Sequence, residues 1–152
     1  MRWKHFVGKG LVIVGGGGVL QDDARQPLHA ARSDVTWHNN TQGETKVGGV
    51  LQFRFGAGGF DMKVLELDPA KRVLWQVVDG PKEWIGTKVS WELKQEGDYT
   101  IVLFKHQGWK KPVEFMHHCS TKWGVFLMSL KALLETGKGA PEPNDIKIDN
   151  WN

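Results

Sequence analysis

The sequence lacks several features that define large classes of protein. Its 152 residues include one cysteine, Cys119, so no intramolecular disulfide can form, and this usage favours a reducing compartment. No apolar run approaches the roughly 20 residues that a membrane-spanning helix requires. The apolar residues 11–14 are too few for the core of a secretory signal and run into glycines. We therefore expect a soluble, cytoplasmic protein with no membrane partner.

A concentrated basic patch is also missing. The formal net charge is +3, and the lysines are scattered along the chain. The only tight basic pair next to an aromatic residue is Lys110 and Lys111, beside Trp109. Nucleic-acid binding requires a basic patch gathered on one face. We therefore expect no nucleic-acid partner.

Motifs for nucleotides and metals are incomplete. The glycines at 15–18 follow a β-branched run, but Leu20 and Gln21 stand where either frame of G-x-G-x-x-G needs its last glycine. His117 and His118 are adjacent, and neighbouring helical side chains point in directions about 100° apart, so one ion would rarely bind both. We expect one of them to face inward and the other to face solvent. The sequence thus predicts neither a cofactor nor a metal.

Tryptophan, in contrast, is abundant, with eight residues in this short chain. Aromatic side chains bring large buried areas, and they build either an ordinary core or the wall of a wide apolar cavity. Both interpretations remain open. The length fits one domain with a substantial core.

The longest apolar pattern predicts an α-helix over residues 113–136. Pro112 precedes it, and Gly137 and Gly139 follow it, which are start and stop signals for a helix. Large apolar residues recur at steps of three and four, which places them on one face. They are Phe115, Met116, Cys119, Trp123, Phe126, Leu127, Leu130, Leu133 and Leu134. Because Cys119 lies on this face, we interpret it as a small buried hydrophobe and not as a nucleophile.

Short alternating runs before this helix predict an antiparallel sheet. The expected strands cover residues 46–55, 60–67, 72–79, 85–94 and 99–106, joined by tight turns rich in glycine, proline and aspartate. Strands followed by one long, one-sided helix indicate an α+β fold in which the sheet curls around the helix. Nearer the N-terminus, the sequence predicts a strand over residues 5–14 and a short helix over residues 22–32.

Several segments resemble the SRPBCC superfamily. F-D-M-K-V-L-E-L-D-P at 60–69 is similar to the strand that precedes its usual D-P turn, and R-V-L-W at 72–75 and G-D-Y-T-I-V-L-F-K-H-Q-G-W at 97–109 resemble later strands. The run K-W-G-V-F-L-M-S-L-K-A-L-L-E-T-G-K-G-A-P at 122–141 resembles the closing helix of one branch, the homologues of the activator of the heat-shock chaperone Hsp90 ATPase. The run N-N-T-Q-G-E-T-K-V-G-G at 39–49 fits the start of its second strand.

The resemblance implies a helix-grip fold, as in START domains and the birch pollen allergen. In that fold an antiparallel sheet grips the C-terminal helix and encloses a hydrophobic cavity. The similarity covers residues 37–152, which we predict as the helix-grip domain. Residues 1–36 are atypical: they would supply the first strand and a degenerate helix pair, and only Trp37 remains of the aromatic motif that usually follows.

The predicted ligand site is the apolar space between sheet and helix. Its expected lining comprises Phe53, Phe55, Phe60, Met62, Trp75, Trp91, His106, Trp109, Trp123 and Phe126. His106 shares a strand face with Phe104 and Val102, and among aromatics its pKa would fall. It would then serve either as a ligand contact or general base, or as an ordinary core histidine.

The function predicted from these observations is non-catalytic binding of a small hydrophobic molecule, with a role in stress response. The alternative is a protein-interaction module that binds a chaperone or another protein. A third class is a cyclase- or hydrolase-type enzyme using His106 or a carboxylate, but no strand carboxylates have the spacing of an acid–base pair. Asp61 and Glu66, for example, are five residues apart on one strand, which predicts opposite faces. A filled interior would favour the interaction module.

Overall fold

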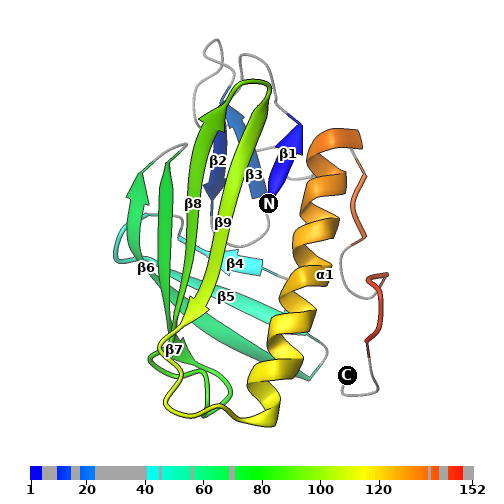
Figure 1. The fold of residues 1–152 in the computed structure, drawn as a ribbon. Coiled ribbons are helices and arrows are strands. Elements are labelled where there is room, and N and C mark those ends of the chain that lie inside the picture. The colour runs from blue at the N-terminus through cyan, green and yellow to red at the C-terminus, as the bar shows by residue number, and fades with distance from the viewer. Residues whose placement is uncertain are drawn as a thin grey trace.

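A curved antiparallel sheet and one long helix form the body of the protein (Figure 1). This computed structural model describes residues 1–4, 10–14, 18–22, 41–44, 46–55, 57–68, 71–136, 138–140 and 144–148. The strands are β1 (Arg2–Lys4), β2 (Gly10–Val14), β3 (Gly18–Asp22), β4 (Thr41–Gly43), β5 (Val50–Phe55), β6 (Gly58–Asp68), β7 (Arg72–Asp79), β8 (Lys88–Glu96) and β9 (Tyr99–Gln107); the helix is α1 (Glu114–Thr136). The predicted α+β helix-grip architecture is confirmed.

Within the described residues, seven strands make the main sheet, in the order β1-β9-β8-β7-β6-β5-β4. Each neighbouring pair is antiparallel, and β2 and β3 form a separate two-stranded hairpin. The register between β6 and β7 shifts at Asp61/Met62 and again at Val64/Glu66. Such irregularities bend a strand and increase its twist, and in Figure 1 β5 and β6 cross under α1 while β8 and β9 rise beside it.

The core lies between the inner face of this sheet and α1. Alternate residues of β7 point inward, with Val73, Trp75 and Val77 all buried. On α1 the buried apolar residues are Cys119, Trp123, Phe126, Leu127, Leu130, Leu133 and Leu134, as the spacing predicted. Gly80 ends β7 with φ of 129°, and a Cβ there would lie 2.6 Å from Cβ of Phe60, so the strand end requires glycine.

Two predicted strands are shorter in the structure. Residues 81–87 form turns instead of the start of a strand, because the Trp84 amide donates to the Pro81 carbonyl (2.9 Å) and the Thr87 amide donates to the Trp84 carbonyl (2.8 Å). Residues 46–49 likewise turn, with the Gly49 amide donating to the Lys46 carbonyl at 2.8 Å. Alternation of apolar residues continues through both turns, so the sequence pattern alone extended the strands.

The first residues belong to the main sheet. β1 pairs with β9, the amino group of Met1 donates to the Val102 carbonyl at 2.9 Å, and the Val102 amide donates to the Met1 carbonyl at 2.8 Å. Of the predicted strand over residues 5–14, residues 10–14 form β2 and residues 5–9 lie outside the described residues. The predicted helix over residues 22–32 lies outside the described residues except for Asp22, which ends β3, and Trp37 lies outside them as well.

The C-terminal residues return along α1 (Figure 1). The Ala140 amide donates to Oγ of Ser129 at 2.8 Å. Further along, the buried carboxylate of Asp145 pairs with Nζ of Lys122 at 2.6 Å and with Nζ of Lys147 at 3.0 Å. Burial raises the pKa of Asp145, but the hydrogen bonds and charges of the two lysines outweigh this effect and hold it below its ordinary value. These contacts fasten the tail to the helix. Within the described residues, no helix has the length and apolar character to cross a bilayer.

Candidate functional site

The predicted lining residues gather between the sheet and α1. Core positions are occupied by Phe53, Met62, Trp75, Trp91, Trp123 and Phe126, and the half-buried Phe60 and Trp109 pack against them. His106 contacts the same cluster through Trp84, Trp109 and Trp123. Phe55 lies at the end of β5, and its side chain is outside the described part of the structure. A role of these residues in binding a ligand stays a prediction.

The centre of this interior is filled by protein side chains. A void large enough for a water molecule would leave exposed surface on the side chains around it. Phe53 and Trp91 are each 1% exposed, and Met62 and Trp75 are each 0% exposed. Ring centroids lie 6.1 Å apart for Phe53 and Trp75 and again for Trp75 and Trp91, which is the contact range of packed aromatics. The described residues therefore enclose no water-sized space at this point.

His106 is held by two hydrogen bonds. Nε1 of Trp123, which can only donate, gives its proton to Nδ1 of His106 at 3.2 Å. The ring proton of a neutral His106 must then be on Nε2, which lies 2.9 Å from Oγ1 of Thr87. Oγ1 of Thr87 in turn donates to the Trp84 carbonyl at 2.5 Å. Each donor in this series of hydrogen bonds has one acceptor, so both imidazole nitrogens of His106 are engaged.

Burial lowers the pKa of His106 to about 4, so the imidazole is neutral at physiological pH. A general base needs a free nitrogen within reach of a substrate proton, and in this arrangement Nδ1 already accepts from Trp123. The geometry therefore matches the core-histidine interpretation of this residue.

Trp84 is the centre of this cluster, and the sequence pattern did not single it out. Its ring lies 4.9 Å from that of His106, 4.8 Å from that of Phe60 and 6.4 Å from those of Trp109 and Trp123. These partners come from β6, β9, the β9–α1 connection and α1. Trp84 thus joins both layers at one end of the interior. Its position in the turn after Gly80-Pro81 concealed this role, because Trp84 is out of step with the alternation through Ile85, Thr87 and Val89.

Cys119 is buried, as predicted, and is 4% exposed. Nε1 of Trp84 donates to its Sγ at 3.3 Å. Burial raises the pKa of the thiol to about 11, and the hydrogen bond from Trp84 only partly opposes this. Since the thiolate is the reactive form, Cys119 is a packing residue and not a nucleophile.

The two adjacent histidines on α1 lie in different surroundings. His117 is exposed, whereas His118 is half-buried and stacks on Phe115 with ring centroids 6.0 Å apart. This is the arrangement that their helical spacing predicted. Among the described residues, no group of three potential metal ligands converges on one point.

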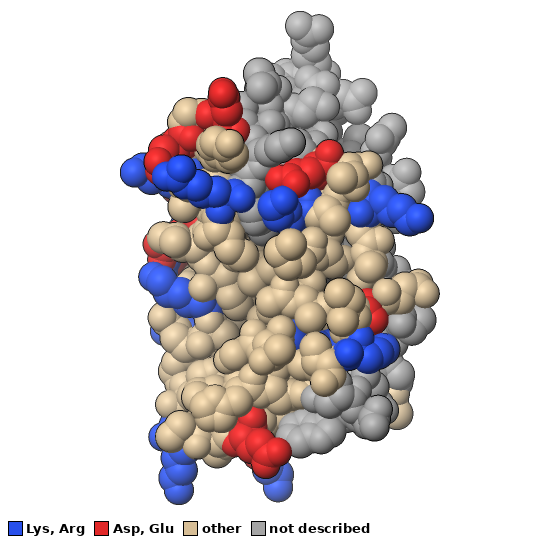
Figure 2. Space-filling model, turned by 45° about the vertical axis from the view of Figure 1, so that its right-hand side comes forward, with Lys and Arg blue, Asp and Glu red and all other residues tan. Residues whose placement is uncertain are grey.

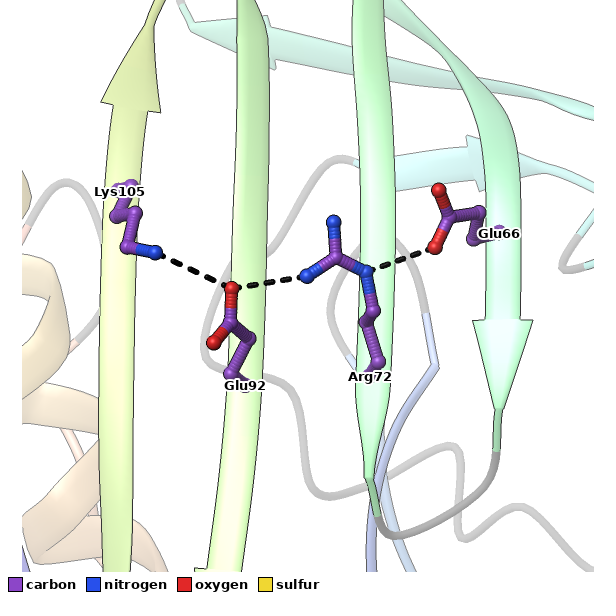
Figure 3. A network of polar contacts seen from close by, with 4 residues as sticks. All are labelled: Glu66, Arg72, Glu92 and Lys105. Carbon is purple, nitrogen blue, oxygen red and sulfur yellow. Dashed lines mark hydrogen bonds and ion pairs between the residues drawn. The ribbon is translucent and has the colours of Figure 1, made fainter.

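The outer face of the sheet carries a ladder of alternating charges across β6, β7, β8 and β9 (Figure 3). Glu66 accepts from Arg72 at 2.7 Å, Arg72 donates to Glu92 at 2.8 Å, and Lys105 reaches the same oxygen of Glu92 at 3.2 Å. The hydrogen bond and charge of Lys105, with those of Arg72, hold the pKa of Glu92 below its ordinary value. We call these four residues the charge ladder.

The ladder corrects the expectation that Asp61 and Glu66 lie on opposite faces. Asp61 pairs with the exposed Arg54 at 2.6 Å on the outer face. Glu66 also points outward, toward Arg72, because the irregularity after Val64 shifts the alternation by one residue. Neither carboxylate approaches the interior as a catalytic group would.

Comparison with known proteins gives a consistent family. Residues 30–135 match the family described as Activator of Hsp90 ATPase homolog 1-like protein. The solution structure of the Aha1 dimer from Colwellia psychrerythraea is 46% identical, with a TM-score of 0.63, over 68% of this chain and 78% of that one. No curated protein matches this chain.

CalU16 from Micromonospora echinospora shares the fold at 19% identity. Its solution structure aligns with a TM-score of 0.58 over 76% of this chain and 61% of that one, and its crystal structure with 0.51 over 64% and 58%. The resemblance to the SRPBCC branch of Hsp90 ATPase activator homologues is confirmed. This chain belongs to the family of Activator of Hsp90 ATPase homolog 1-like proteins.

Proposed function

We propose that the protein is a non-catalytic interaction module whose partner is an Hsp90-class chaperone ATPase. The observation that carries the proposal is the filled interior, in which Phe53, Met62, Trp75 and Trp91 have essentially no exposed surface. These four side chains leave no room for a ligand among them, which favours action through the outer surface of the domain. The family and the 46% identical Aha1 support a chaperone as the partner.

The charge ladder is the surface that we assign to this contact. Its residues lie on four adjacent strands, so their charges are fixed relative to one another, and their side chains retain between 34% and 51% of their exposure. Leu103, which is 47% exposed, lies opposite Glu92 on β9 and adds apolar area. Alternating charges on a rigid surface orient a partner and accelerate its approach.

The test is the ATPase rate of a purified Hsp90 titrated with this protein. We expect stimulation that saturates, and a weaker response from Glu92→Lys, which breaks the ladder at its centre. Glu44→Lys is the matched control, because Glu44 is an exposed carboxylate paired with Lys46 away from the ladder. Unchanged ATPase activity together with no binding in calorimetry would refute the chaperone as the partner.

A small ligand is the second candidate, and one atom favours it. Nε1 of Trp75 is a buried donor with no hydrogen-bond partner among the described residues. Leaving such a group unpaired is costly, and an acceptor atom on an apolar ligand would satisfy it if the interior opened. Native mass spectrometry of the purified protein tests this candidate. A small-molecule adduct that leaves on mild activation supports it, and a bare protein mass counts against it.

The proposal includes self-association, as in the dimeric relative from Colwellia psychrerythraea. Sedimentation velocity over a range of protein concentrations is the measurement. A species of twice the mass of the 17.1 kDa chain is expected. A monomer at every concentration would contradict this part of the proposal without affecting the chaperone contact.

A further inference from the structure

The exposed side of α1 has an unusual composition. From His117 to Met128, the exposed residues of α1 are His117, Ser120, Thr121, Gly124 and Met128, which we call the α1 stripe; Glu114, one turn before them, and Thr136 at the end of the helix are exposed as well. Their spacing of three and four residues keeps them on one face, and none of them is Lys, Arg, Asp or Glu. In the view from the α1 side, the middle of the molecule is largely tan, and charged side chains gather toward its ends and margins (Figure 2).

The two hydroxyl groups of the α1 stripe are hydrogen-bonded within the helix itself. Oγ of Ser120 donates to the Met116 carbonyl at 2.8 Å, and Oγ1 of Thr121 donates to the His117 carbonyl at 3.2 Å. These bonds to the preceding turn satisfy the two hydroxyl donors within the helix. Met128 is 59% exposed and is among the most exposed large hydrophobic residues described. The stripe is therefore suited to packing and not to recognition of a charged group.

Gly124 lies at the middle of the α1 stripe, and no contact within the described chain explains why this position is a glycine. A Cβ added there would meet no heavy atom within 4 Å. Glycine inside a helix is destabilising relative to alanine, so neither helix formation nor packing of this domain accounts for it. Glycine also allows another backbone to approach closely. A partner that packs directly against this turn of α1 would account for it.

We propose that the α1 stripe is the surface through which two copies of this chain associate. The inference rests on the self-association included in the proposed function and names its site. In a two-fold contact the same patch meets itself, so a charged patch would place like charges together, whereas the α1 stripe meets itself without repulsion. Crossing at Gly124 brings the two helices together there, with Met128 of each copy covering the other. Lys131 and Glu135, one turn beyond, neutralise each other at 2.6 Å.

This arrangement leaves the charge ladder free in both copies. The ladder lies on the outer face of the sheet, whereas α1 covers the inner face. The α1 side of the molecule and the ladder thus serve different partners. A dimer formed through α1 presents two ladders to solvent.

The test compares three variants by sedimentation velocity at matched concentrations. Gly124→Ala adds one methyl group to open space in the monomer, and Met128→Lys places a positive charge on each half of the contact. Leu103→Lys is the control, because Leu103 is similarly exposed but belongs to β9 on the outer face. We expect both α1 variants to weaken association at least tenfold and Leu103→Lys to leave it unchanged. Circular dichroism melting verifies that each variant is folded, and Gly124→Ala should melt at or above the parent temperature.

A dimer that persists in both folded α1 variants would overturn the assignment of this surface while leaving self-association standing. Loss of association in Leu103→Lys as well would equally overturn it. If the α1 variants lower ATPase stimulation without changing the sedimentation of the protein, the stripe binds the chaperone and not a second copy. A parent protein that is monomeric throughout refutes self-association itself.

Discussion

Acidification should destabilise the protein through His106. The pKa of this residue is lowered from 6.5 to about 4 in the folded chain by burial. Because the folded pKa lies below the unfolded one, protons bind preferentially to the unfolded chain. The stabilising contribution is therefore complete above about pH 6.5 and is lost as the pH falls toward 4. Protonation would also remove the acceptor at Nδ1 that Trp123 uses.

The size of this loss of stability follows from the change in the pKa of His106 on folding. One pKa unit corresponds to about 1.36 kcal/mol, so the change from 6.5 to about 4 sets an upper bound of about 3.4 kcal/mol for His106. The imidazole is only partly buried, and water screens part of this interaction. We therefore expect about 2 kcal/mol, which is a large part of the stability of a small domain.

The assay is urea unfolding at a series of pH values from about 7.5 to about 4.5. This range covers the pH at which His106 titrates in the unfolded chain. His106→Gln carries no titrating group and retains an amide that can accept from Trp123 and donate to Thr87. It should be less stable than the parent at neutral pH, with a flatter pH dependence. Asp145 has a pKa below its ordinary value of 3.8, so the stability it contributes is present throughout this window and is lost only at lower pH. An equal pH dependence in His106→Gln and the parent would refute the reasoning.

Three other predictions concern packing and edges. Asp145→Ala should lower the free energy of unfolding by about 2 kcal/mol, because it leaves Lys122 unpaired against the helix, and limited proteolysis should then cut the C-terminal tail sooner. Deletion of residues 1–4 removes β1 and exposes the edge of β9, so we expect a loss of about 2 kcal/mol from lost backbone hydrogen bonds and increased aggregation in light scattering. Cys119 should react with a thiol reagent at least about 100-fold more slowly in the folded than in the unfolded protein, because its pKa rises from 9.0 to about 11; equal rates would contradict its burial.

The interior of this domain contains two kinds of tryptophan. Trp75 and Trp91 lie in the centre of the filled interior, whereas Trp84 and Trp123 donate hydrogen bonds to Cys119 and His106 at one end. The first pair supplies buried area, and the second pair fixes the relative position of turn, strand and helix. The sequence pattern grouped Trp75, Trp91 and Trp123 as lining residues without distinguishing these roles, and it did not single out Trp84.

Local periodicity was enough to determine the main elements. The apolar steps of three and four before Gly137 predicted α1 to within one residue, and the alternation of Val73, Trp75 and Val77 predicted β7 with its observed bounds. Both patterns depend only on neighbours along the chain, so they can be read without knowing the partners. The same alternation extended β5 and β8 too far, since turns at residues 46–49 and 81–87 are defined by backbone hydrogen bonds and not by side-chain pattern.

The state of the site was decided only by the tertiary structure. Sequence spacing placed His106 on the inner face, but its neutral form and its engaged nitrogens depend on Thr87 and Trp123, which lie 19 and 17 residues away in the chain. Whether aromatics line a cavity or fill it depends on the curvature of the sheet and on the distance of α1 from it. These are sums of many weak contacts between residues distant in sequence. Eight tryptophans predicted a large apolar interior, and only the three-dimensional packing showed that Trp75 and Trp91 are buried at its centre.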